Sequence, residues 1–78
     1  MEYITATVPH SGQVKKFGIE AITYKGKEAW KVTFDDGDVE IIARNEKEKM
    51  WEQLDGKNLD QDFVDELGDE ITYAGITR

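Results

Sequence analysis

Side chains that could act as a nucleophile or general base are few in this chain of 78 residues. It has no cysteine, one serine (Ser11) and one histidine (His10). Both lie in Pro9–Gly12, whose composition is typical of a loop. A working base needs an orienting partner and a pocket, and the residues around His10 indicate neither. The sequence therefore predicts no catalytic residue, and a small enzyme using His10 is a disfavoured alternative.

Carboxylates are the other candidates, since the chain has 17 Asp and Glu residues. Acid–base catalysis needs two of them in a concave pocket with pKa values pushed apart, whereas the acidic residues here are expected on a convex helix face. Oxygen ligands for a cation gather at Asp35–Asp38 and Asp60–Asp62. The EF-hand pattern requires Gly at its sixth position, and Asp65 stands there when the count begins at Asp60. Phosphate-binding glycine motifs are absent, so we expect no metal and no cofactor.

The net charge of −7 is unevenly placed along the chain. Residues 1–44 contain six basic and seven acidic groups (6 − 7 = −1), and residues 45–78 contain four and ten (4 − 10 = −6). Nucleic acid or an anionic membrane needs a basic footprint, so neither is expected as a partner. A basic protein partner is permitted, although an acidic surface can also serve solubility alone. The candidate acidic contact residues are Asp62, Asp65, Glu66 and Asp69.

The elements that would position these groups begin with strands in the first half of the chain. Apolar residues alternate over Glu2–Val8 and Gln13–Tyr24, which predicts two strands. Lys25-Gly26 and Asp36-Gly37 are typical two-residue hairpin turns, and they predict two further strands. Together the two turns predict three cross-strand rows on one face: Phe17–Phe34–Val39, Ile19–Val32–Ile41 and Ala21–Trp30–Ala43.

Helix signals follow in the second half. Asn45 with Glu48 three residues later forms a capping-box pattern, which predicts a helix that ends at Asp55–Gly56. Asp60 is expected to cap a shorter helix that ends at Gly68. The segment Glu70–Ile76 is expected to form a last short strand.

The predicted fold class is α+β, as one small domain over residues 1–78. An antiparallel β-meander of three to five strands carries two short C-terminal helices on one face. Its predicted core is Trp30, Val32, Phe34, Met50, Trp51, Phe63 and Leu67. The predicted register leaves a small apolar patch on the opposite face, formed by Ile22, Tyr24, Ala29 and Ile42. Such a patch can mark a partner contact or be covered by the chain itself, and an open sheet edge could form a homodimer.

The segment Trp30–Glu40 resembles the strand–turn–strand of Tudor-type small barrels in its aromatic-x-Val-x-Phe-Asp-Asp-Gly-Asp string. The resemblance implies an SH3-like barrel that reads methylated lysine or arginine through an aromatic cage. It covers about eleven residues, and two C-terminal helices are not that family's pattern.

The function expected from the sequence is a small acidic non-enzymatic protein-interaction module of the accessory, inhibitor or charge-mimic type. A Tudor-like peptide reader is the alternative, and a small enzyme or metal-binding protein is the third hypothesis. Because the first residues lack a basic segment followed by a long apolar run, a cytoplasmic location is expected.

Overall fold

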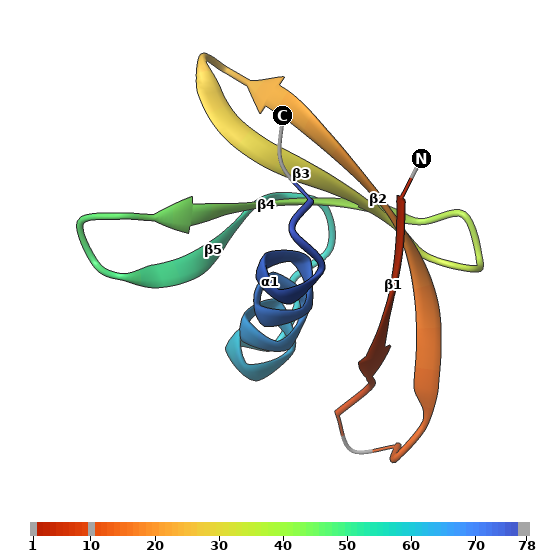
Figure 1. The fold of residues 1–78 in the computed structure, drawn as a ribbon. Helices are drawn as coiled ribbons and strands as arrows, with labels where there is room; N and C mark the ends of the chain where they lie inside the picture. The colour runs from red at the N-terminus through yellow and green to blue at the C-terminus, as the bar shows by residue number, and fades with distance from the viewer. Residues whose placement is uncertain (1, 10, 77–78) are drawn as a thin grey trace.

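A computed structural model describes residues 2–9 and 11–76. Five strands form one antiparallel sheet in chain order, and a single helix packs against it (Figure 1). The elements are β1 (Glu2–Thr7), β2 (Val14–Tyr24), β3 (Lys27–Thr33), β4 (Val39–Asn45), β5 (Met50–Asp55) and α1 (Gln61–Ala74). The predicted α+β meander is therefore confirmed, with one helix in place of two. The described helix is too short and too polar to cross a membrane.

The hairpin of β2 and β3 follows the register predicted from Lys25-Gly26. Both turn residues have positive φ, 51° and 79°, as a two-residue type I′ turn requires. Ile19 pairs with Val32 and Ala21 pairs with Trp30, so these predicted pairs are confirmed.

The turn between β3 and β4 differs from the prediction by one residue. The Phe34 N–H donates to the Asp38 carbonyl at 2.8 Å, and the Gly37 N–H donates to the Phe34 carbonyl at 3.0 Å. The loop thus has three residues and ends with Gly37 at φ 92°, which is the type I turn with a glycine bulge. Asp36 favours this form because its carboxylate accepts the Asp38 N–H at 2.9 Å.

This one-residue shift reverses the two faces of β4, because side chains alternate along a strand. Val32 now pairs with Glu40 and Trp30 with Ile42, so Glu40 and Ile42 face α1. The predicted pairing of Phe34 with Val39, Val32 with Ile41 and Trp30 with Ala43 is wrong. Ile41 and Ala43 instead lie on the face opposite the helix, and Val39 is exposed.

The predicted helix after Asn45 is a hairpin. β4 ends at Asn45 and β5 begins at Met50. The Asn45 side chain accepts the Glu48 N–H at 3.0 Å, so the capping interaction forms. Only one turn follows, because Lys49 adopts φ 58° and turns the chain back along β4. Met50, predicted as core, is 41% exposed, whereas Trp51 is buried.

The last predicted strand is also wrong, since α1 continues through Glu70 to Ala74. The Gly75 N–H donates to Thr72 and the Ile76 N–H to Ile71, at 3.1 and 3.2 Å, which is the Schellman ending. Gly68 therefore lies inside the helix. A Cβ at Gly68 would stand 2.2 Å from Cδ2 of Trp51, so glycine allows the helix to approach the indole.

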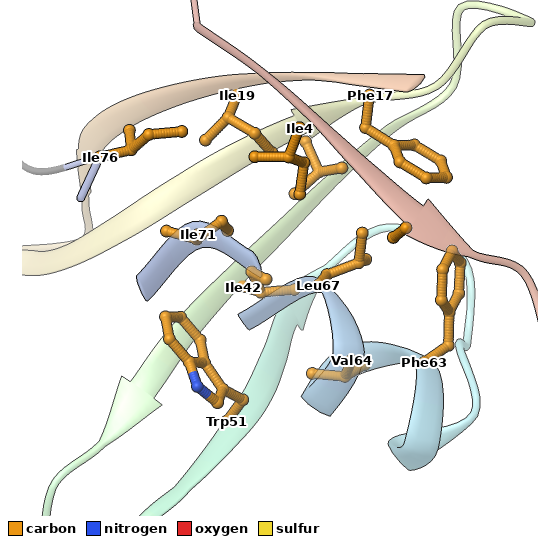
Figure 2. Packing of buried hydrophobic residues seen from close by; sticks show 12 residues of the cluster. Ile4, Phe17, Ile19, Ile42, Trp51, Phe63, Val64, Leu67, Ile71 and Ile76 are labelled. Atoms are coloured by element: carbon orange, nitrogen blue, oxygen red, sulfur yellow. The ribbon is translucent and has the colours of Figure 1, made fainter. Parts of the chain in front are cut away.

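The main core lies between α1 and the face of the sheet that α1 covers (Figure 2). Val64, Leu67 and Ile71 project from the helix, and Trp51 and Ile42 lie opposite them. The Phe17 ring contacts the rings of Phe34 and Phe63 edge to face, at centroid distances of 5.0 and 5.8 Å. Buried members of this core are Ile4, Ala6, Phe17, Ile19, Val32, Ile42, Trp51, Phe63, Val64, Leu67, Ile71 and Ile76.

The helix lies between the two edge strands, β1 on one side and β5 on the other (Figure 1). Glu66 accepts the Thr7 N–H of β1 at 3.2 Å. Gln61 donates to the Trp51 carbonyl of β5 at 2.7 Å. Because edge strands expose unpaired backbone groups that invite association, these two side chains partly protect both edges.

Candidate functional site

The residues considered for catalysis and metal binding are the one histidine and the acidic residues near two turns. His10 lies outside the described residues. Asp36 has a structural role in its turn, and Asp60 stands before α1 without a side-chain capping bond. No group of three or more Asp, Glu or His side chains among residues 2–9 and 11–76 is placed to hold a metal ion.

Two residues of the predicted apolar patch, Ile22 and Tyr24, are half-buried. Ile22 and Tyr24 lie on the face opposite α1 as expected, and they pack around Ala29, Ile41 and Ala43 with Leu54 of β5. The Tyr24 hydroxyl donates to Asp55 at 3.1 Å. The prediction that Ile42 belongs to this patch is wrong, because the register shift places Ile42 in the main core with no exposed surface.

The four predicted acidic residues do share a helix. Asp62, Asp65, Glu66 and Asp69, which we call the acidic stripe, recur every three or four residues along α1, so they lie on neighbouring turns. Asp65 and Glu66 are half-buried and the other two are exposed. Tyr73, four residues after Asp69, is 88% exposed, and it continues this line of side chains.

The charge of α1 is not neutralised locally. The helix carries five carboxylates, the acidic stripe and Glu70, with no Lys or Arg between Gln61 and Ala74. None of the five forms an ion pair with a described residue. The ion pairs between described residues lie on the sheet and its loops, as Lys15–Asp35, Lys27–Glu52, Lys31–Glu20 and Lys57–Asp38.

A groove of about 420 Å³ opens where the end of α1 meets β3, β4 and β5. Trp30 and Trp51 meet there edge to face, with ring centroids 5.3 Å apart. Trp30 is half-buried and donates its indole N–H to the Ile76 carbonyl at 3.0 Å. Trp51 is 4% exposed, and its indole N–H has no acceptor among residues 2–9 and 11–76. The full lining is Trp30, Arg44, Glu46, Trp51, Ile71, Thr72, Gly75 and Ile76.

Sequence reasoning missed this groove because two of its parts were placed wrongly. The predicted register puts Arg44 on the face opposite the core, whereas it pairs with Trp51 across β4 and β5 on the helix side. Trp51 was assigned to a helix. The Asp36-Gly37 dipeptide is the feature that could have revealed the groove. It also suits a three-residue loop, and that loop places Arg44 on the helix side.

A buried carboxylate lies at the other end of β4. Glu40 is 2% exposed and accepts a hydrogen bond from the Gln53 amide at 2.6 Å. Burial, with the nearby Asp38 carboxylate, raises the pKa of Glu40, and hydrogen bonds from the Lys57 N–H and Gln53 oppose that rise.

Gln53 connects this carboxylate to the segment that leads to α1. Its amide also donates to the carbonyls of Asp55 and Lys57, and its oxygen accepts the Leu59 N–H at 2.9 Å. The arrangement is a set of satisfied contacts that holds the end of β5 and the following loop, so we assign it a structural role.

No family model, curated protein or solved structure matches this chain.

Proposed function

We propose that this protein is a small non-enzymatic interaction module that binds a basic protein partner through the acidic stripe of α1. The observation that carries the proposal is the placement of charge. All Lys–carboxylate pairs between described residues lie on the sheet and its loops, and the five helix carboxylates form no ion pair with a residue of that part of the chain.

Unpaired like charges on one helix lower the stability of the free protein. Like charges three and four residues apart on a helix repel by a few tenths of a kcal/mol each. Asp62 lies in the first turn of α1, where the helix dipole favours an anion, so the repulsion falls on the stripe residues further along the helix. A basic partner would relieve this repulsion and would be steered to the surface by the field.

Tyr73 gives the surface an anchor that charge alone lacks. A tyrosine offers a large apolar ring with a polar tip, and exposed aromatic residues often dominate binding energy in protein interfaces. Because Tyr73 stands at the end of the acidic stripe, a partner with a cationic segment beside an apolar pocket would fit this surface.

The Tudor-like alternative requires an open aromatic cage that accepts a methylammonium group. Trp30 and Trp51 lie together in the groove, which favours it in part. Trp51 is buried, however, and Arg44 contributes a positive charge to the lining. A methylated lysine would be repelled there, so we favour the acidic stripe.

The test compares two variants of equal net charge in affinity capture from a lysate of the native host. D62N/D65N/D69N removes three charges from the acidic stripe, and the control E2Q/E28Q/E48Q removes three from exposed positions elsewhere. Both have a net charge of −4 (−7 + 3). Captured proteins are quantified by mass spectrometry over a range from about 50 mM to about 500 mM salt.

We expect a basic protein that wild type and the control retain at low salt, that high salt releases, and that the stripe variant binds roughly tenfold more weakly. Y73A should also weaken it. Equal capture by the two triple variants, or capture that salt does not change, would show that the acidic stripe has no role in binding.

A further inference from the structure

We propose that the groove beside Trp30 and Trp51 is a separate binding site for a small apolar carboxylate, such as an arylalkanoic acid. The inference does not depend on the acidic stripe. The groove is formed by Ile71 and the residues that end α1, together with the strand residues opposite them.

The size and walls of the groove suit an apolar body. Its volume of about 420 Å³ lies within the usual range of ligand pockets, about 300 to 1,000 Å³. Two indole rings and the side chains of Ile71 and Ile76 are the large apolar groups of its lining. Figure 2 shows the indole of Trp51 directed from β5 towards Ile71 of α1.

The polar groups of the groove indicate an anionic acceptor. An indole N–H can only donate, and a buried donor without an acceptor is rare in folded proteins. Within the part of the chain that the structure describes, the Trp51 N–H is such a donor. The Trp30 N–H, by contrast, is already used by the Ile76 carbonyl.

Arg44 provides the second donor. It faces Trp51 as its cross-strand neighbour and forms no ion pair with a described residue. A guanidinium and an indole N–H on adjacent strands suit a carboxylate, because its oxygens can accept from both.

The other charged residue of the lining, Glu46, lies in the exposed turn after β4. Its carboxylate would weaken the binding of an anion and strengthen that of a cation. Arg44 has the opposite effect, so substitutions at these two positions distinguish the two ligand classes by sign.

The experiment follows the two tryptophan indole N–H resonances by ¹⁵N-edited NMR during titration with three probes of the same shape. They are 3-phenylpropionate, its neutral amide 3-phenylpropionamide, and the cation 2-phenylethylammonium. The variants R44Q and E46Q are each matched to a substitution in the turn after β4 that removes the same charge at a residue that does not line the groove. These controls are K47Q for R44Q and E48Q for E46Q.

We expect 3-phenylpropionate to move the Trp51 resonance and to bind more tightly than the amide. R44Q should weaken its binding roughly tenfold, K47Q should leave it unchanged, and E46Q should strengthen it relative to E48Q. W51F, which removes the N–H and keeps an aromatic ring, should weaken it as well.

Three outcomes would overturn the proposal. The ammonium probe could bind best, with the effects of R44Q and E46Q reversed, which would indicate a cation site. R44Q and K47Q could have equal effects. The third outcome is that none of the probes shifts either resonance and the Trp51 N–H exchanges readily with solvent. This result would show that water alone is the hydrogen-bond acceptor of the Trp51 N–H.

Discussion

Replacing Gly68 by alanine tests the packing of α1 on the sheet. A Cβ at Gly68 would lie 2.2, 2.3 and 2.4 Å from Cδ2, Cε2 and Cγ of Trp51, whereas carbon atoms prefer about 3.5–4.0 Å. Trp51 is 4% exposed, and its ring also contacts Trp30 edge to face. The indole and the helix must therefore separate by more than 1 Å, roughly, if they keep that spacing.

The free energy of unfolding should fall although alanine is the better helix former. The propensity gain is about 1 kcal/mol, and overpacking in a core costs about 1–3 kcal/mol or more. Because three ring atoms are contacted at once, we take the upper end, which gives a net loss of about 2 kcal/mol. For a domain of this size that corresponds to a fall in Tm of roughly 8–16 °C.

The assay is thermal and urea unfolding followed by circular dichroism, with two controls. D69A, at the next position, is exposed and should leave stability unchanged or slightly higher. In a W51L background the smaller, flexible side chain can move, so the cost of G68A should shrink. If G68A raised Tm in the wild-type background, Gly68 would not lie against Trp51 and the described helix packing would be wrong.

Four further substitutions test the turn and the two perturbed carboxylates. G37A should lose about 1 kcal/mol, because Gly37 has φ 92°, and G37N should lose less; equal stability of all three proteins in urea would contradict the three-residue loop. The raised pKa of Glu40 means that its ionisation removes stability as the pH rises from its unfolded to its folded pKa. E40Q should therefore gain on wild type as the pH rises above the unfolded pKa of a glutamate, about 4.3, and a gap that does not change with pH would refute this. Hydrogen bonds from Lys27 and Asn45 lower the pKa of Glu52, so its contribution is present above the unfolded pKa and lost as the pH falls through the folded pKa. E52Q should be less stable than wild type near pH 7 and approach it in acid, the opposite trend to E40Q.

The first half of the fold could be predicted because local chemistry and long-range packing agree there. Alternation in β1 and β2 places Ile4, Ala6, Phe17 and Ile19 on one face, and all four are buried. A two-residue type I′ turn at Lys25-Gly26 matches the twist of the two strands that it joins. The observed pairs between β2 and β3 follow from this turn.

Asp36-Gly37 could not be assigned in the same way, because the dipeptide suits two loops of different length. Both give Gly a positive φ, and both present a plausible apolar row. The two-residue loop places Ile41 and Ala43 on the same face as Val32, while the observed loop places Glu40 and Ile42 there and leaves Ile41 and Ala43 on the opposite face. From the sequence, a glutamate in the core has no evident hydrogen-bond partner. Its partner is the Gln53 amide, which donates to the Glu40 carboxylate from a strand that the sequence predicts as helix.

The secondary structure of the second half was predicted wrongly for a related reason. Asn45 and Glu48 form the same hydrogen bond in a tight hairpin as at the start of a helix, so the pattern does not decide how many turns follow. Gly68 is read as a helix end because glycine is common there. Its actual reason, the indole of Trp51, lies 17 residues earlier (68 − 51) and is visible only in three dimensions.

The candidate sites were predictable to different degrees. The acidic stripe could be located because its four residues recur three or four positions apart on a single helix. The groove could not, because it combines Trp30, Trp51 and the end of α1 from three separate elements. Its key cation, Arg44, changes face with the register of a single hairpin.

That register is therefore the most direct test, through cross-strand Hα–Hα nuclear Overhauser effects between β3 and β4. Phe34 and Asp38 are joined by a backbone hydrogen bond, so the next pair, Thr33 with Val39, is a non-hydrogen-bonded pair whose α-protons lie close. Strong effects are predicted for Thr33 with Val39 and for Lys31 with Ile41. Strong effects for Phe34 with Val39 and for Val32 with Ile41 would mean a two-residue loop, and would remove Arg44 from the groove and Glu40 from the core.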